Sequence, residues 1–186
     1  MIGRCCEALL GSFKVWNAAT VGGNICLALP AGPMIALAAA LGGIATVWRP
    51  DGGERRLNVA DLVRGERRTA LVEGEILRSV LLPRAALRRR FAFRQMSLTP
   101  LGLSAVLAIG TLDGNGGFAL TLTAATTRPV RLAFPAPPSP AILAARIDEA
   151  VSRPGLWQDD SHGDPAWRRH ISRIFAEEIR QELEEP

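Results

Sequence analysis

Aromatic residues are scarce in this sequence: tyrosine is absent, and aromatic residues make up only 5% of the 186 residues. The formal net charge is +4, which suits nucleic acid, an acidic membrane surface or an acidic protein as a partner. The densest arginine cluster, Arg84 and Arg88 to Arg90, lies between two strand-like segments, where a solvated loop is the commoner structure. Because no aromatic stacking platform or recognition-helix pattern accompanies this charge, we do not expect nucleic-acid binding and keep it as a third alternative.

Cysteine is also rare, since Cys5, Cys6 and Cys26 are the only three and no CxxC spacing occurs. This pattern indicates neither a disulfide framework nor a zinc site, so we expect no metal in this chain and a reducing, cytoplasmic location. Adjacent Cys5 and Cys6 cannot both be ligands of a four-cysteine iron–sulfur cluster held within the chain. Any such cluster must therefore belong to another polypeptide, and the three cysteines are interpreted as small buried hydrophobic residues.

Charge is missing between Lys14 and Arg49, a length that would suit a membrane span. The segment is interrupted by glycine and proline at Gly22, Gly23, Pro30, Gly32, Pro33, Gly42 and Gly43. The resulting short pieces could not satisfy their own backbone groups in lipid, so we do not expect a span. The start of the chain also lacks the basic region and continuous apolar stretch of a signal peptide.

The overall composition, 48% hydrophobic and 22% charged, is typical of a globular protein with one domain or two small ones. In the first part of the chain, the sequence predicts a weak helix over Met1 to Leu10. It also predicts a helix over Pro33 to Leu41, with proline in its first turn. A β-hairpin follows, in which Ile44 to Trp48 and Glu54 to Val59 flank an Asp-Gly-Gly turn.

In the second part of the chain, the sequence predicts further strands followed by helices. Strands are expected over Ile76 to Leu82 and Phe91 to Ser97, followed by a three-stranded antiparallel meander over Ala105 to Leu112, Phe118 to Ala124 and Val130 to Phe134. A proline-rich connector leads to a helix from about Ala141 to Val151. The last helix is predicted by an apolar stripe at three- and four-residue spacing, formed by Trp167, Ile171, Ile174, Phe175, Ile179 and Leu183. The fold class is therefore α+β, with a predicted division near Leu87 into residues 1–87 and 88–186.

The string ATVGGNI, Ala19 to Ile25, is the most informative segment of the chain. Gly22 and Gly23 would let the backbone approach a bulky anion without side-chain interference. Their amides, together with the Thr20 hydroxyl and the Asn24 side chain, would form a donor-lined nest for a phosphate. A plain turn is the alternative interpretation of such a glycine pair.

The longer segment NAATVGGNICLALPAG, Asn17 to Gly32, resembles the second FAD-binding segment of the medium subunits of molybdenum hydroxylases, the xanthine and carbon monoxide dehydrogenase family. Later blocks are similar to the same family in the same order. These blocks are Asp61, Leu62 and Gly65 to Leu71, the GEIL element Gly74 to Leu77 with a strand closing at Pro83, FRQMS at Phe93 to Ser97, and Asp160, His162, Trp167, Arg168 and Arg169. The resemblance covers nearly the whole chain, and the first segment is far more specific than the rest.

The resemblance implies an oxidoreductase subunit that binds FAD and passes electrons from iron–sulfur clusters on a small partner subunit to an acceptor. It implies the second subdomain of a PCMH-type FAD-binding domain, followed by a C-terminal domain like that of the CO dehydrogenase flavoprotein. A large molybdopterin subunit would complete the complex. The implied cofactor-binding residues are Thr20, Val21, Gly22, Gly23 and Asn24 on the pyrophosphate and adenosine side, Leu77 at the flavin, and Arg94 near the ring.

The sequence departs from the family pattern in two places. Pro33 stands where the family usually has an acidic residue that reaches the adenosine ribose. The family's first FAD subdomain, with its own glycine-rich loop, is also not found in this sequence. We therefore expect the isolated chain to bind FAD weakly or not at all. We also expect the apolar face of Ile25 to Leu41 to be exposed and the chain to be stable only with partners or as an oligomer. A non-catalytic subunit or assembly module that holds no flavin is the main alternative function.

The two histidines, His162 and His170, are the remaining candidates for chemistry. No serine or cysteine nucleophile is arranged with them to suggest a triad, and two histidines alone make a poor metal site. We interpret both as capping or surface residues and assign no catalytic residue.

Overall fold

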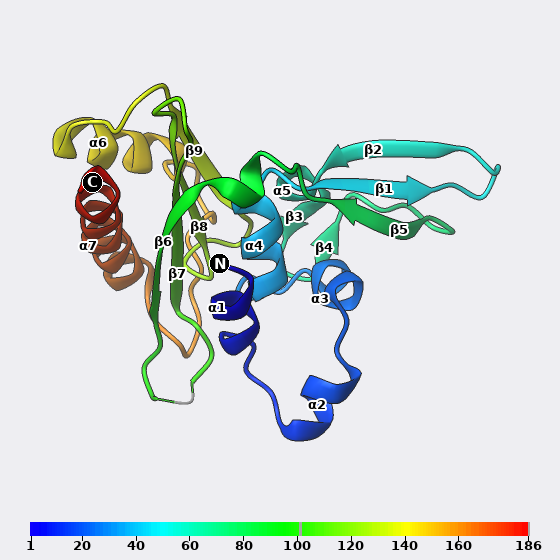
Figure 1. Ribbon diagram of the computed structural model, residues 1–186. Coiled ribbons are helices and arrows are strands. Elements are labelled where there is room, and N and C mark those ends of the chain that lie inside the picture. The colour runs from blue at the N-terminus through cyan, green and yellow to red at the C-terminus, as the bar shows by residue number, and fades with distance from the viewer. Residues whose placement is uncertain (101, 186) are drawn as a thin grey trace.

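A four-stranded antiparallel sheet forms the centre of the protein in the computed structural model, which describes residues 1–100 and 102–185. Its strands, in the order β6 (Arg90–Met96), β7 (Val106–Leu112), β8 (Phe118–Thr123) and β9 (Val130–Phe134), are sequential neighbours. The predicted α+β fold class is confirmed, and the sheet holds one strand more than the predicted meander because β6 pairs with β7. Every residue of β8 is buried, since helices cover both faces of the sheet (Figure 1).

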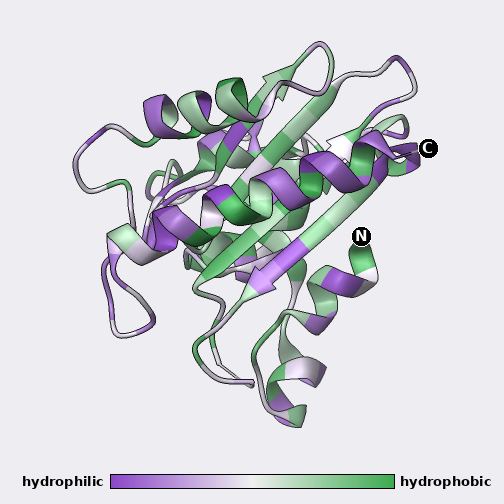
Figure 2. Cartoon of the chain, turned by 90° about the vertical axis from the view of Figure 1, so that its left-hand side faces the viewer, coloured by the Kyte–Doolittle hydropathy of each residue, from purple (hydrophilic) through white to green (hydrophobic). Residues whose placement is uncertain are grey.

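One face of this sheet is covered by α6 (Pro140–Ala150) and α7 (Pro165–Glu184), which lie across it in Figure 2. The predicted stripe of α7 is confirmed at Phe175, Ile179 and Leu183, whereas Ile174 is 40% exposed. Arg168 lies in the buried face instead and is only 1% exposed. Its guanidinium donates to the carbonyls of Gly163, Ala105 and Ala124 and pairs with Asp160, which satisfies the buried charge.

The other face of the sheet is covered by α4 (Pro33–Ala40), whose eight residues are all buried. The helix begins with proline, as predicted, and ends where Gly42 adopts a positive φ of 65°. The amide of Gly43 donates to the carbonyl of Ala38 at 2.6 Å, which closes the helix end. Because α4 packs on strands from residues 88–186, one hydrophobic core spans both predicted modules. The division near Leu87 stays a prediction.

A second sheet extends away from the body, with the strand order β2-β1-β5 (Figure 1). Its strands are β1 (Ile44–Trp48), β2 (Glu54–Asn58) and β5 (Ile76–Leu81), so the predicted hairpin is confirmed. In its turn, Gly52 has a φ of 82° and the Asp51 carboxylate accepts from the Gly53 amide at 2.9 Å. Near the turn of the hairpin, the Arg55 guanidinium bonds both carboxylate oxygens of Glu75, the residue before β5.

Several short elements were not predicted. Between α1 (Ile2–Glu7) and α4 the chain forms α2 (Phe13–Ala18) and α3 (Val21–Leu27). After β2 it forms α5 (Val59–Leu62), β3 (Val63–Gly65) and β4 (Arg68–Thr69), and a single 3-10 turn occupies Ala86–Arg88 before β6. The helix α3 matters most for function, because it contains the glycine pair.

The expected exposure of the segment Ile25 to Leu41 is wrong. Ile25 is fully buried, and residues 31–41 are buried because they pack against the central sheet, α1 and α5. Exposed apolar side chains lie instead around α2, where Phe13 is 83% and Trp16 is 57% exposed. Among the helices of residues 1–100 and 102–185, none is both long enough and apolar enough to cross a membrane.

Candidate functional site

The glycine pair lies in the first turn of α3 and not in a loop. Thr20 is the N-cap residue, and its hydroxyl oxygen accepts a hydrogen bond from the Gly23 amide at 2.9 Å. The amides of Val21 and Gly22, which precede the first intrahelical bond, therefore keep their donors for another partner. They stand at the end of the helix where its dipole favours negative charge.

The two glycines of this turn have different surroundings. A Cβ added to Gly22 would meet no atom within 4 Å, so this position faces open space. A Cβ added to Gly23 would lie 2.9 Å from the Thr20 hydroxyl oxygen. Gly23 is thus required by the helix cap, whereas Gly22 leaves room beside the free amides.

Asn24 links two helices, because its side-chain oxygen is occupied. This oxygen accepts a hydrogen bond from the Met34 amide at 3.1 Å, in the first turn of α4. The bond ties the start of α3 to the start of α4 and supplies a cap that α4 lacks from its own N-cap residue, Gly32. The Asn24 amide nitrogen remains available as a donor.

Two adjoining cavities flank the start of α3, and we call them together the α3 trough. One has a volume of about 290 Å³ and is lined by Thr20, Asn24 and Trp16, among others. The other has a volume of about 490 Å³ and is lined by Gly22 and by Leu77 of β5. Cys6, Val21 and Met34 line both. The structure therefore brings five of the predicted residues, Thr20, Val21, Gly22, Asn24 and Leu77, to one place.

Arg94 is not brought to this trough. It lies on β6, and its guanidinium pairs with Glu178 at 2.7 Å and Glu182 at 2.8 Å, both on α7. The helix α7 covers the sheet face opposite α4, so Arg94 points away from α3 and α4. Its predicted position near a flavin ring stays a prediction.

The α1 and α2 walls of the trough were missed by sequence reasoning. Cys6 and Cys26 are exposed, so their interpretation as buried residues is wrong, and only Cys5 is buried. Burial raises the pKa of the Cys5 thiol to about 12. The only sequence signal for these walls was the group of apolar residues around Trp16, whose indole nitrogen donates to the Leu9 carbonyl at 3.0 Å.

A third cavity, of about 390 Å³, lies beside the predicted closing motif and is lined by Glu66, Arg67, Gln158, Asp160, His162 and Arg168, among others. The three non-glycine residues of the described chain with a positive φ, Ala28, Arg67 and Ala124, lie around it. Backbone bonds hold two of them, from the Arg67 amide to the Ala28 carbonyl at 2.9 Å and from the Ala124 amide to the Pro30 carbonyl at 2.8 Å. Such strained conformations persist only where the surrounding structure fixes them.

Comparisons with known proteins concern the family and the fold. Residues 7–85 match the family model described as the FAD binding domain in molybdopterin dehydrogenase, which confirms the resemblance drawn from the sequence. No curated protein matches the chain.

Solved structures share the fold of nearly the whole chain. Quinoline 2-oxidoreductase from Pseudomonas putida 86 superposes with a TM-score of 0.70 and 20% identity, over 98% of this chain and 70% of that chain. The reconstituted CO dehydrogenase from Oligotropha carboxidovorans gives a TM-score of 0.74 and 21% identity, over 96% of this chain and 65% of that chain. The carbon monoxide dehydrogenase from Hydrogenophaga pseudoflava that lacks the Mo-pyranopterin moiety gives a TM-score of 0.74 and 19% identity. The match covers 93% of this chain and 63% of that chain. This chain thus spans 63 to 70% of the length of these three chains.

Proposed function

We propose that the α3 trough binds FAD, because residues 7–85 match the family model of the FAD binding domain in molybdopterin dehydrogenase. The pyrophosphate would lie against the free amides of Val21 and Gly22, with the Thr20 hydroxyl and the Asn24 amide nitrogen as further donors. Leu77, across the larger cavity, would contact the flavin side. This arrangement keeps the predicted residues of α3 and β5 in one site.

The observation that carries the proposal is the open space at Gly22. The absence of a side chain there exposes amides at the positive end of α3 to a cavity of about 490 Å³. A pyrophosphate approaching these amides needs that space, and the cavity walls formed by Met34 and Leu37 are apolar, as expected for a site that holds a ring system. The residues present therefore fit the group.

The chemistry of the bound group would be the redox chemistry of FAD, while the chain's own residues bind and orient it. Amides of α3 hold the phosphates, and the bond between Asn24 and Met34 fixes the position of α3 relative to α4. The apolar walls exclude water from one side of the ligand. Within the α3 trough the charged lining is limited to Glu7 and Arg78, so backbone donors dominate the recognition of phosphate.

We propose further that the chain acts as the FAD-binding, electron-transfer part of a molybdenum-cofactor hydroxylase. Its partners would be an iron–sulfur small subunit that supplies electrons and a molybdopterin large subunit. The exposed apolar side chains of Phe13 and Trp16, next to the trough, support an assembly in which another polypeptide or domain covers this surface. They also support the expectation of an oligomer.

The alternative function is a non-catalytic assembly module that holds no flavin. It is favoured by the engagement of the Thr20 and Asn24 side-chain oxygens in helix caps, because both bonds stabilise the fold without any ligand. Under this alternative the α3 trough is a by-product of the fold, and the surface around α2 is what the chain contributes.

A titration of the purified chain with FAD separates the two functions. The proposal predicts saturable binding, seen by isothermal calorimetry and by a perturbed flavin absorbance spectrum in the bound fraction. Riboflavin, which lacks the pyrophosphate, should bind more weakly because the α3 amides have nothing to hold. Absence of saturable FAD binding, alone and with the partner subunits added, would support the assembly module.

A further inference from the structure

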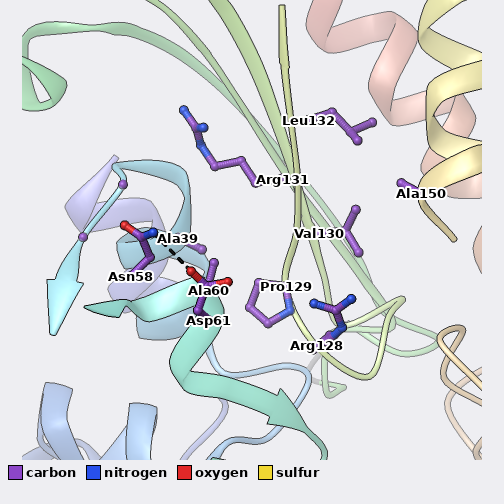
Figure 3. A pocket seen from close by; sticks show the side chains of 12 residues that line it. Ala39, Asn58, Ala60, Asp61, Arg128, Pro129, Val130, Arg131, Leu132 and Ala150 are labelled. Atoms are coloured by element: carbon purple, nitrogen blue, oxygen red, sulfur yellow. Dashed lines mark hydrogen bonds between the residues drawn. The ribbon is translucent and has the colours of Figure 1, made fainter. Parts of the chain in front are cut away.

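A polar cleft lies at the opposite end of α4 from the α3 trough and shares no lining residue with it. It has a volume of about 390 Å³ and is bounded by the end of α4, by α5 and by β9. Figure 3 shows Asn58 and Asp61 on one wall and the segment Arg128 to Leu132 on the other. We call this space the β9 cleft. Asp61 belongs to a sequence block singled out above, and the FAD proposal gives it no role.

Two arginines without a carboxylate partner line this cleft. Among the described residues, neither Arg128 nor Arg131 forms an ion pair, although ten other arginines of the chain do. Arg131 is exposed, and partial desolvation together with the nearby positive charge of Arg89 lowers its pKa. An anion placed beside Arg131 would relieve both effects.

The two guanidinium groups point toward different ends of the cleft in Figure 3. A ligand with two anionic groups separated by a spacer would meet both.

The wall formed by Asn58 and Asp61 offers hydrogen-bond acceptors. The Asn58 amide nitrogen donates to one carboxylate oxygen of Asp61 at 3.1 Å. The second Asp61 oxygen and the Asn58 side-chain oxygen remain free to accept hydrogen bonds from hydroxyl groups. A carboxylate in a cleft with two cations also disfavours a ligand that is anionic along its whole length.

Charge compensation of α4 is the simpler explanation for one of these arginines. The last turn of α4 has no basic residue, so a guanidinium near Gly42 and Gly43 offsets the helix dipole. This role accounts for one of the two arginines and leaves the other and the acceptor pair without a function.

We propose that the β9 cleft binds a hydroxylated organic dianion, that is, a polyol with a phosphate or carboxylate group at each end. One anionic group bonds to Arg128, the other bonds to Arg131, and the hydroxyl groups between them donate to Asp61 and Asn58. The ligand would join residues 39–61 to residues 128–150 and so stabilise the packing of α4 and α5 against β9.

Calorimetric titration of the full chain with fructose 1,6-bisphosphate, fructose 6-phosphate and fructose tests this site. The bisphosphate should bind at least about tenfold more tightly than the monophosphate, which is the gain expected from one further charged hydrogen bond, and fructose should not bind. Glucarate, a sugar with two carboxylates, distinguishes carboxylate from phosphate ligands. Arg128→Ala and Arg131→Ala should each reduce the affinity for the bisphosphate to that for the monophosphate.

Arg153→Ala serves as the matched control, because Arg153 is exposed and lies outside the cleft. It should leave the affinity for the bisphosphate unchanged. Arg131→Gln replaces Arg131→Ala if the latter fails to fold. The proposal is overturned if neither the bisphosphate nor glucarate shows saturable binding, or if Arg153→Ala weakens binding as much as the two cleft variants do.

Discussion

The hydroxyl oxygen of Thr20 lies 2.9 Å from the amide nitrogen of Gly23, and this bond caps the helix that carries the glycine pair. Removing it with Thr20→Ala should lower the free energy of unfolding by about 1 kcal/mol and weaken FAD binding, because α3 would fray at its ligand-binding end. Thr20→Ser keeps the oxygen and should preserve both properties. Urea denaturation and FAD titration of the variants provide the measurement.

Gly23→Val should act through the same cap. Its Cβ would lie 2.9 Å from the Thr20 oxygen, so the valine displaces the hydroxyl from the helix start. The double variant Thr20→Ala with Gly23→Val should therefore be less destabilised than the sum of the two single variants. Additive losses would show that the two residues do not share one cap.

The acid stability of the protein should depend on Glu75. The hydrogen bonds from Arg55, with one from the Val72 amide, hold the pKa of the Glu75 carboxyl at about 2, below its ordinary value of 4.5. A carboxyl with a lowered folded-state pKa contributes stability above the unfolded-state pKa and loses it as the pH falls toward the folded-state pKa. Unfolding measured between pH 5 and pH 2 should show a steeper loss of stability in the wild type than in Glu75→Gln. An equal dependence of stability on pH in the wild type and in Glu75→Gln would contradict this role of Glu75.

The contact between α7 and the central sheet depends on Gly110. A Cβ at this position would lie 2.1 Å from Cγ2 of Ile179, so Gly110→Ala should destabilise the protein by about 1 to 3 kcal/mol through overpacking. Adding Ile179→Ala should recover part of that loss, although Ile179→Ala alone leaves a cavity. A double-mutant cycle from urea denaturation measures the recovered free energy of unfolding. No recovery would show that the alanine at position 110 does not clash with Ile179.

Arg94 offers a test of the family-derived role near the flavin ring. Its ion pairs with Glu178 and Glu182 are partly exposed, so Arg94→Ala should cost at most about 1 kcal/mol of stability. The family-derived role predicts a changed flavin spectrum in this variant, whereas the direction of its side chain toward α7 predicts an unchanged one. A changed spectrum in Arg94→Ala, with no change in Glu182→Ala, would show that the arginine reaches the ring.

Local signals in the sequence were enough for much of the fold. Proline at the start and paired glycines at the end of Pro33 to Leu41 define α4 without help from the rest of the chain, and the Asp-Gly-Gly turn does the same for the hairpin. The helix α3 was missed because a glycine pair favours a turn when read alone. It is fixed by the Thr20 cap and by the bond from Met34 to Asn24, which joins residues ten positions apart.

The same limit explains the errors in the site and in α7. Arg168 was recognised only as part of a motif, and its burial was not predicted, because the Ala105 and Ala124 carbonyls that satisfy it are 63 and 44 residues away. The Cys6 and Trp16 walls of the α3 trough depend on how α1 and α2 fold back beside α3. No local pattern in the sequence predicts this placement of α1 and α2. The glycine pair, in contrast, could be recognised from the sequence around it.

The FAD affinity and melting temperature of Gly22 variants test the central claim most directly. A side chain at Gly22 meets no protein atom within 4 Å, so Gly22→Ala and Gly22→Leu should keep or raise the melting temperature, since both residues favour a helix more than glycine does. If the pyrophosphate of FAD lies against the amides of this turn, the FAD affinity should fall with alanine and fall further with leucine. Opposite changes in stability and affinity are the predicted result. Unchanged FAD affinity in Gly22→Leu would contradict the assignment of the α3 trough as the FAD site.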